Sequence, residues 1–266
     1  MISHINSLIQ GAFIVVIASG CFTGIIYLQF NRLSNQDIQK SKSYYIQQEN
    51  REETQINTLT QAPTFGFDNL VADWAYYRFL QYFGDKPARR ETGYSLLPEY
   101  LEAIAKKDPR FIEAYRYIAP VSSIYAGRPK ETVRWLEKAL EKLSPETPSS
   151  YLVWVNKAYD ELLFLGNADE ASQSYKMAAQ WAKASDNLVA QRNAKGLYQT
   201  ARFLEQNPNS IIPRIASWGM VLKQSQDQEI KEIAIEKIEN LGGKVNIDSQ
   251  GKVQIQFPQS NNKNDT

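Results

Sequence analysis

Cysteine and histidine are almost absent from this chain of 266 residues, which contains one of each. Cys21 lies inside the longest apolar run and His4 precedes that run, so the polar remainder contains neither residue. This absence excludes disulfide bonds, thiolate nucleophiles, zinc sites built from Cys and His, and catalytic triads of the Ser-His-Asp kind from the remainder.

An excess of charge of either sign is also missing. The chain has 30 basic and 29 acidic residues and a formal net charge of +1, which gives no electrostatic basis for binding nucleic acid. We expect the basic runs around Arg89 and Lys106 to be solvated loop charge, with contact to anionic lipid headgroups as the alternative.

The sequence contains no glycine-rich phosphate loop and no metal-ligand spacing. Candidate carboxylate pairs are Asp68 with Asp73 and Asp160 with Glu161, but adjacent residues on a helix point in different directions. We therefore expect no catalytic residues, no cofactor and no metal, and a protein that is not an enzyme.

The longest apolar run extends from Leu8 to Phe30, reads LIQGAFIVVIASGCFTGIIYLQF, and has no charged residue. At about 1.5 Å per residue it is long enough to cross the ~30 Å hydrocarbon core of a bilayer as a helix. We expect a transmembrane anchor over residues 1–33. The alternatives are a cleaved signal peptide, a buried core helix, and a lipoprotein, because the four residues that end at Cys21 resemble a lipobox.

Two features of this run bear on partners and orientation. Gly20 and Gly24 have the G-x-x-x-G spacing that lets membrane helices pack closely, so a homodimer through the anchor is one expectation, although glycine is common in membrane helices. Arg32, Lys40 and Lys42 follow the run, and the positive-inside rule places the rest of the chain on the cytoplasmic or stromal side.

Residues 34–63 are rich in Gln, Asn, Ser and Lys. We interpret them as a linker or a frayed helical extension of the anchor.

An unusually aromatic stretch follows at Phe65–Asp85. Asp68 or Asn69 is a candidate cap, and Gly84 a candidate end, for a helix. Its apolar residues with helical spacing are Leu70, Val71, Trp74, Tyr77, Leu80 and Phe83. Such a helix is either buried by its own domain or forms a surface that meets a membrane or a partner protein.

The chain from residue 64 to 241 is predicted to be a helical domain. The expected helices after the aromatic one are Pro98–Lys107, Arg110–Tyr125 with a kink at Pro120, Pro129–Leu143, Ser149–Leu165, Asp169–Lys183, Asn187–Gln206, Ile211–Lys223 and Gln226–Leu241.

Two helix pairs in this domain share a pattern with a period of 39 residues. Leu136 and Ala139 follow Gly127 by nine and twelve residues. Tyr175 and Ala178 follow Gly166 by the same two spacings. This pattern resembles the tetratricopeptide repeat, in which a glycine turns between two helices and small residues let the helices pack closely. Thr132 stands where that repeat has alanine, and the period is longer than usual.

The resemblance implies a stack of helical hairpins that binds an extended peptide or a helix on its concave face. Matching the positions that line this face gives partner-binding candidates: Glu113, Arg116, Ser123, Asn156, Asp160 and Phe164. Arg116 beside Asn156 would hold a carboxylate or a peptide backbone. The alternative is that these are ordinary exposed helix residues.

The strings GFDNLVADWAYYRFLQYFGD and TGYSLLPEYLEAIAKKDPRFIEAYRY also resemble a group of membrane-anchored cyanobacterial helical-repeat proteins of unassigned function. This resemblance implies a thylakoid or plasma membrane setting.

Residues 242–257 alternate apolar and polar residues around Asp248–Gly251, which predicts a β-hairpin with Val245, Ile247, Val253, Ile255 and Phe257 on one face. We expect it to lie against the last helix or to extend a partner's sheet. Residues 258–266 are interpreted as a disordered tail.

Together these patterns predict an all-α fold with an N-terminal transmembrane helix and a small C-terminal hairpin. The expected function is a membrane-anchored protein–protein interaction scaffold, such as an assembly factor for a photosynthetic membrane complex. A permanent structural subunit of a membrane complex is the alternative.

Overall fold

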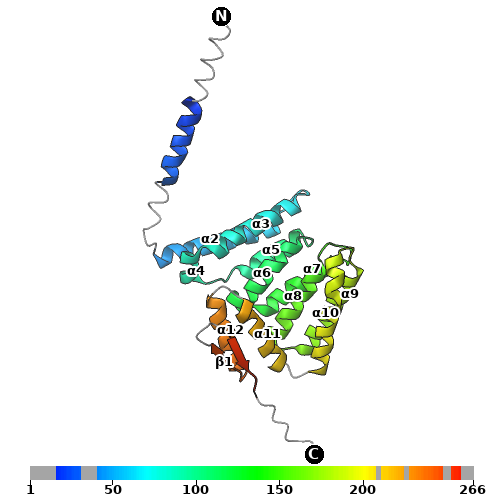
Figure 1. Ribbon diagram of the computed structural model, residues 1–266. Coiled ribbons are helices and arrows are strands. Elements are labelled where there is room, and N and C mark those ends of the chain that lie inside the picture. The colour runs from blue at the N-terminus through cyan, green and yellow to red at the C-terminus, as the bar shows by residue number, and fades with distance from the viewer. Residues whose placement is uncertain (1–15, 31–40, 208–210, 225–227, 248–252, 259–266) are drawn as a thin grey trace, which may run out of the picture. The chain divides into compact units, whose positions relative to one another are not determined.

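The computed structural model describes residues 16–30, 41–207, 211–224, 228–247 and 253–258 (Figure 1). The chain divides into two compact units, Met1–Gln47 and Gln48–Thr266. The described residues are mostly helical, and a small antiparallel sheet lies near the C-terminus. This confirms the prediction of a mainly helical fold with a small C-terminal β-hairpin.

Most of the helices lie close to the predicted ranges, but a short helix over residues 86–92 lies where solvated loop charge was expected. The helices are α2 (Lys42–Gln61), α3 (Asp68–Gly84), α4 (Lys86–Thr92), α5 (Leu97–Lys107), α6 (Ile112–Val121), α7 (Pro129–Leu140), α8 (Tyr151–Leu163), α9 (Ala168–Ala184), α10 (Leu188–Gln206), α11 (Ile211–Gln224) and α12 (Gln228–Asn240).

The predicted helix Arg110–Tyr125 is divided in two. After α6 the chain continues as a π-helical turn, η1 (Ser122–Ala126). Pro120, inside α6, lacks the amide hydrogen that would continue the α-helical ladder, and its ring interferes with the carbonyl one turn earlier. Single π-helical turns of this kind are frequent at functional sites.

In the first unit, residues 16–30 form a helix whose large apolar side chains are exposed, among them Phe22, Leu28 and Phe30. Gly20, Cys21 and Gly24 lie in this helix. No helix within the described ranges is both long enough and apolar enough to span a bilayer. Residues 1–15 and 31–33 of the predicted anchor lie outside those ranges.

Much of the segment interpreted as a linker is a regular helix, α2, while residues 34–40 lie outside the described part of the chain. In the second unit, Glu49 and Ile56 of this helix are buried. From Gln48 onward α2 is therefore part of the packed helical unit.

The buried face of α3 differs from the predicted one. Ala72, Ala75, Phe79 and Tyr82 are buried, whereas Leu70, Tyr77 and Leu80 of the predicted stripe are exposed. The small alanines allow α5 to approach, and the Tyr82 hydroxyl has a buried hydrogen-bond partner on α2. Large apolar side chains are thus left on the outer face of α3.

Helices α5 to α10 form a stack of hairpins, visible in Figure 1 as neighbouring rods. Each helix contacts the next along the chain, and α6 also contacts α8. The two predicted turn glycines stand between helices of this stack. Gly127 has φ +65° and Gly166 has φ +70°, in the left-handed region that glycine adopts without a steric penalty.

The sheet pairs β1 (Lys244–Ile247) with β2 (Val253–Gln256), and Val245 lies opposite Ile255. Val245, Val253 and Ile255 pack with Ala234 and Ile238 of α12. The hairpin therefore lies against the last helix. Its predicted turn and the predicted tail beyond residue 258 lie outside the described residues.

Candidate functional site

A cavity of about 250 Å³ lies where α6, α8 and α11 meet. Its lining residues are Pro120, Ile124, Asn156, Tyr159, Asp160, Leu163, Phe164, Ser217, Trp218, Met220 and Val221. Most of these side chains are aliphatic or aromatic, and the polar groups among them are few.

The six residues predicted to bind a partner separate into two groups. Asn156 and Asp160 of α8, and Phe164 directly after it, lie four residues apart and line this cavity, as helical spacing requires of residues on one face. Ser123 is buried in η1. The other two, Glu113 and Arg116, lie on exposed surface of α6 and pair with each other, with Arg116 Nη1 2.9 Å from Glu113 Oε2.

Asn156 is held by the fold. Its side-chain Nδ2 donates to the backbone carbonyl of Tyr115 at 3.2 Å and so joins α8 to α6. An amide bound in this way fixes its own orientation, and it helps to position the neighbouring cavity wall.

Two adjacent carboxylates on α8 have very different surroundings. Glu161 is buried and accepts hydrogen bonds from the Lys157 ammonium and, at 2.6 Å, from the Ser174 hydroxyl. Asp160 is 2% exposed, and none of the ion pairs among the described residues includes it. Its Oδ2 is buried with no hydrogen-bond partner.

Burial raises the pKa of Asp160 well above its usual range. The Ser123 hydroxyl lies near enough to oppose this rise in part, although its Oγ makes no hydrogen bond of good geometry, and the Glu161 carboxylate adds to the rise. The site therefore holds a carboxyl group whose charged form is disfavoured by burial.

Trp218 of α11 is one of the cavity residues that the sequence did not predict. It is fully buried, and its indole N–H has no hydrogen-bond partner. Its ring meets Phe164 edge to face, with centroids 5.1 Å apart. The glycine-based repeat pattern ends before α11, so the sequence placed no residue of that helix at the site.

Replacement of Asp160 by Asn is expected to stabilise the protein by roughly 1–3 kcal/mol at pH 8, because burial disfavours the ionised carboxyl that the unfolded chain carries at this pH, whereas the amide is neutral. Because the pKa of Asp160 is higher in the folded than in the unfolded protein, the wild-type protein is most stable below the unfolded pKa. Its free energy of unfolding falls as the pH rises from the unfolded pKa through the folded pKa. The stability difference between Asp160→Asn and wild type should therefore shrink as the pH falls from 8 to about 4.

Urea unfolding of the full chain in detergent, followed by circular dichroism at each pH, measures this difference. Asp186→Asn, which alters an exposed aspartate, should follow wild type at every pH. A constant difference, or an Asp160→Asn protein that is less stable at pH 8, would show that Asp160 has an internal partner.

A larger groove of about 480 Å³ adjoins the cavity. Residues of α8, α9, α10 and α11 line it: Tyr151, Leu152, Val155, Tyr159, Leu162, Tyr175, Asn193, Gly196, Leu197, Thr200, Phe203, Leu204, Pro213, Ala216, Ser217 and Met220. Tyr159, Ser217 and Met220 line both spaces. We call the larger space the α8–α11 groove.

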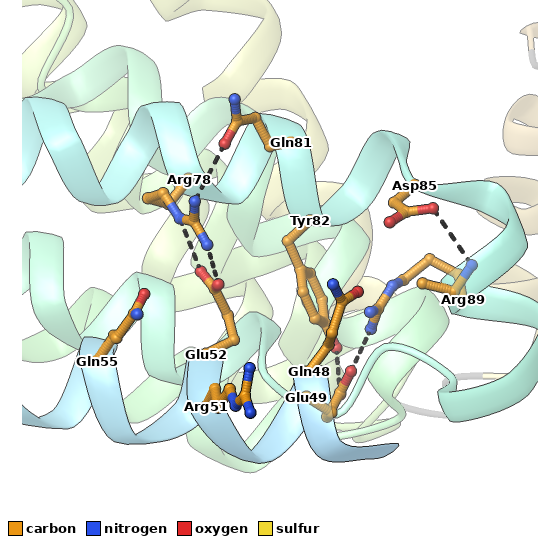
Figure 2. Close-up of a pocket in the computed structure, with 11 residues that line it drawn as sticks. Gln48, Glu49, Arg51, Glu52, Gln55, Arg78, Gln81, Tyr82, Asp85 and Arg89 are labelled. Carbon is orange, nitrogen blue, oxygen red and sulfur yellow. Dashed lines mark hydrogen bonds and ion pairs between the residues drawn. The ribbon is translucent and has the colours of Figure 1, made fainter. Parts of the chain in front are cut away.

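A second hollow, of about 340 Å³, lies between α2, α3 and α4 and is rich in charge (Figure 2). Figure 2 shows Glu49 and Glu52 pointing from α2 toward Arg89 and Arg78. Glu49 accepts hydrogen bonds from Arg89 at 2.8 Å and from Tyr82 at 2.7 Å. The expectation that Arg89 is solvated loop charge is therefore wrong: it is a buried partner of α2, 8% exposed.

The carboxylates of this hollow are already satisfied by the protein. Thr92 and Ser95 hydroxyls each donate to Glu49 at 2.8 Å, and the Tyr100 hydroxyl donates to Glu52 at 2.7 Å. These groups hold α2 in place. Among the described residues, no three His, Cys, Asp or Glu side chains are grouped so as to hold a metal ion.

No protein-family model matches the chain, and no match was found among the curated proteins or the solved structures.

Proposed function

We propose that this protein is a membrane-anchored scaffold that binds a segment of a partner protein, an extended peptide or a helix, in the α8–α11 groove. The observation that carries the proposal is the apolar lining of this groove.

Large apolar side chains of the groove face solvent. Tyr159 is 41% exposed, Phe203 is 46% exposed and Met220 is 49% exposed, although buried core lies directly behind them at Tyr175 and Leu204. Contiguous exposed apolar surface rimmed by polar groups is typical of a protein-binding site. A short apolar segment or an amphipathic helix fits such a groove, with its anchor side chains in the hollow.

The arrangement of helices supports the same proposal. Helix α6 packs on α8, α9 packs on both α8 and α10, and the turn glycines Gly127 and Gly166 have the left-handed conformation expected from the tetratricopeptide-like pattern. Proteins built from stacked hairpins present extended binding surfaces formed by several repeats.

The membrane part of the proposal rests on residues 8–30. They include no charged side chain, and the described portion, residues 16–30, is a helix with its large apolar side chains exposed. Lys40 and Lys42 beyond it favour the cytoplasmic or stromal side for the helical unit, at the plasma or thylakoid membrane. Pairing of two anchors through Gly20 and Gly24 belongs to the same proposal.

A second role, as a permanent subunit of a membrane complex, is favoured by one specific observation. Leu70, Tyr77 and Leu80 form an exposed apolar face on α3, away from the groove residues in sequence and on a different helix. A permanent neighbour covering this face would explain why the large side chains of α3 point outward.

Position-specific photo-crosslinking in native membranes tests the proposal. The full chain carrying p-benzoylphenylalanine in place of Phe203 is expected to form a discrete crosslinked product on illumination, because Phe203 lies in the groove. The same probe at Tyr77 reports on α3, and the probe at Tyr117, which is 54% exposed on α6, serves as the control.

A product at position 203 and none at 77 or 117 supports the scaffold. A product at 77 alone favours the permanent subunit, and equal products at all three positions contradict a specific groove.

A further inference from the structure

The unpaired carboxylate of Asp160 is the least expected feature of the helical unit. Buried charges in proteins are normally paired, because removing an isolated carboxylate from water costs several kcal/mol. Asp160 is 2% exposed and lines a cavity, yet its Oδ2 has no donor among the described residues. The neighbouring Glu161 shows how the same helix satisfies a carboxylate that serves only the fold.

The described part of the chain supplies no cation to this group. The nearest lysine in sequence, Lys157, is engaged by Glu161 and also lies 3.4 Å from Glu137. Arg214 of α11 donates from Nη2 to the backbone carbonyl of Leu163, a cavity residue, at 3.5 Å, but none of the ion pairs among the described residues joins it to Asp160. None of the ion pairs among the described residues therefore gives Asp160 a positive partner.

The walls of the cavity suit an organic cation. Phe164 and Trp218 meet edge to face at 5.1 Å, and Leu163 and Val221 complete an apolar lining. Aromatic rings attract ammonium and guanidinium groups, and the attraction grows where water is excluded. The volume of about 250 Å³ exceeds that of a butyl chain with one charged end.

The cavity also has a route to the surface. Tyr159 and Met220 are about half exposed and line both the cavity and the α8–α11 groove. The cavity and the groove therefore adjoin at these two side chains.

We propose that this cavity binds an alkylammonium or guanidinium group, with the charged end against the Asp160 carboxylate and the apolar stem against Phe164, Leu163 and Val221. The proposal does not depend on a bound partner protein. The cation has two possible sources: a free small amine, or a Lys or Arg side chain of a segment lying in the groove.

The test is a titration of the full chain in detergent at pH 8 with n-butylammonium and n-propylguanidinium, followed by saturation-transfer NMR of the probe. We expect saturable binding with a Kd on the order of 1 mM. The neutral n-pentanol, of similar size, should bind at least about tenfold more weakly, because it lacks the charge. This comparison uses the wild-type protein and needs no variant.

Variants then assign the charge to Asp160. Asp160→Asn should weaken n-butylammonium binding by about tenfold or more and leave n-pentanol binding unchanged. Asp186→Asn, at an exposed position, should leave both unchanged. Absence of saturable binding, equal binding of n-pentanol and n-butylammonium, or unchanged binding in a folded Asp160→Asn protein would overturn the proposal.

A competition experiment separates the two sources. If a partner side chain is the natural occupant, n-butylammonium should reduce the crosslinked product at position 203 in wild type but not in Asp160→Asn. If a free amine is the occupant, the probe binds without reducing that product. The titration itself involves no partner, so failure of groove crosslinking does not change what the titration says about the cavity.

Discussion

Replacement of Glu49 by Ala should destabilise the helical unit by about 3–5 kcal/mol, the range found when one member of a buried ion pair is removed. Glu49 is 9% exposed and receives four hydrogen bonds, from Tyr82, Arg89, Thr92 and Ser95. Without Glu49, the buried Arg89 guanidinium loses its ion-pair partner. Its Nε already lacks a hydrogen-bond partner, so the loss adds to an existing deficit.

The surroundings of Arg89 explain why rearrangement offers little relief. Its guanidinium lies 3.5 Å from the centre of the Tyr82 ring, and its Nη1 also donates to the carbonyl of Gly93 at 2.7 Å. Burial raises the pKa of Tyr82, so this phenol stays a neutral hydrogen-bond donor at physiological pH. The loss of Glu49 thus leaves several buried donors without an acceptor.

Urea unfolding of the full chain in detergent measures the effect, with Glu53→Ala as the matched control. Glu53 is exposed on the same helix, and its replacement should change the free energy of unfolding by no more than about 0.5 kcal/mol. A loss below about 1 kcal/mol for Glu49→Ala would show that α2 is not held by this carboxylate.

Helix positions and turns were predictable because their signals are local. Gly127 and Gly166 both adopt the left-handed conformation expected of turn glycines, and α10 starts directly after Asn187, within one residue of the predicted start. Asn156 and Asp160 share the cavity because residues four apart lie on one helical face.

Long-range pairings were not predictable in this way. Arg89 finds Glu49 from 40 residues away, and a charge pattern gives no sign of that contact. The orientation of α3 did not follow from its apolar spacing, because the predicted stripe includes Tyr77, which is exposed, whereas Ala72 and Ala75 lie on the packed face. Trp218 was missed because its helix lies beyond the recognisable repeats.

A double replacement in the groove, Phe203→Glu with Met220→Glu, should weaken partner binding by about 100-fold or more, equivalent to about 2.7 kcal/mol. Both side chains are exposed, so two glutamates there place charge in the apolar groove without entering the core. The free energy of unfolding should change by no more than about 1 kcal/mol.

The matched control is Tyr77→Glu with Leu80→Glu. These residues are 59% and 48% exposed on α3, so they present comparable apolar surface outside the groove. Circular dichroism and urea unfolding verify that both double variants remain folded.

The most direct test of the groove as the partner site uses these proteins together. Wild type, the groove variant and the α3 variant are expressed as full chains, photo-crosslinked through p-benzoylphenylalanine at Leu197 of the groove, and the crosslinked partner is quantified in native membranes. We expect equal yields for wild type and the α3 variant, and loss of nearly all product for the groove variant. A groove variant that retains the wild-type yield, while the α3 variant loses it, would contradict the proposed function.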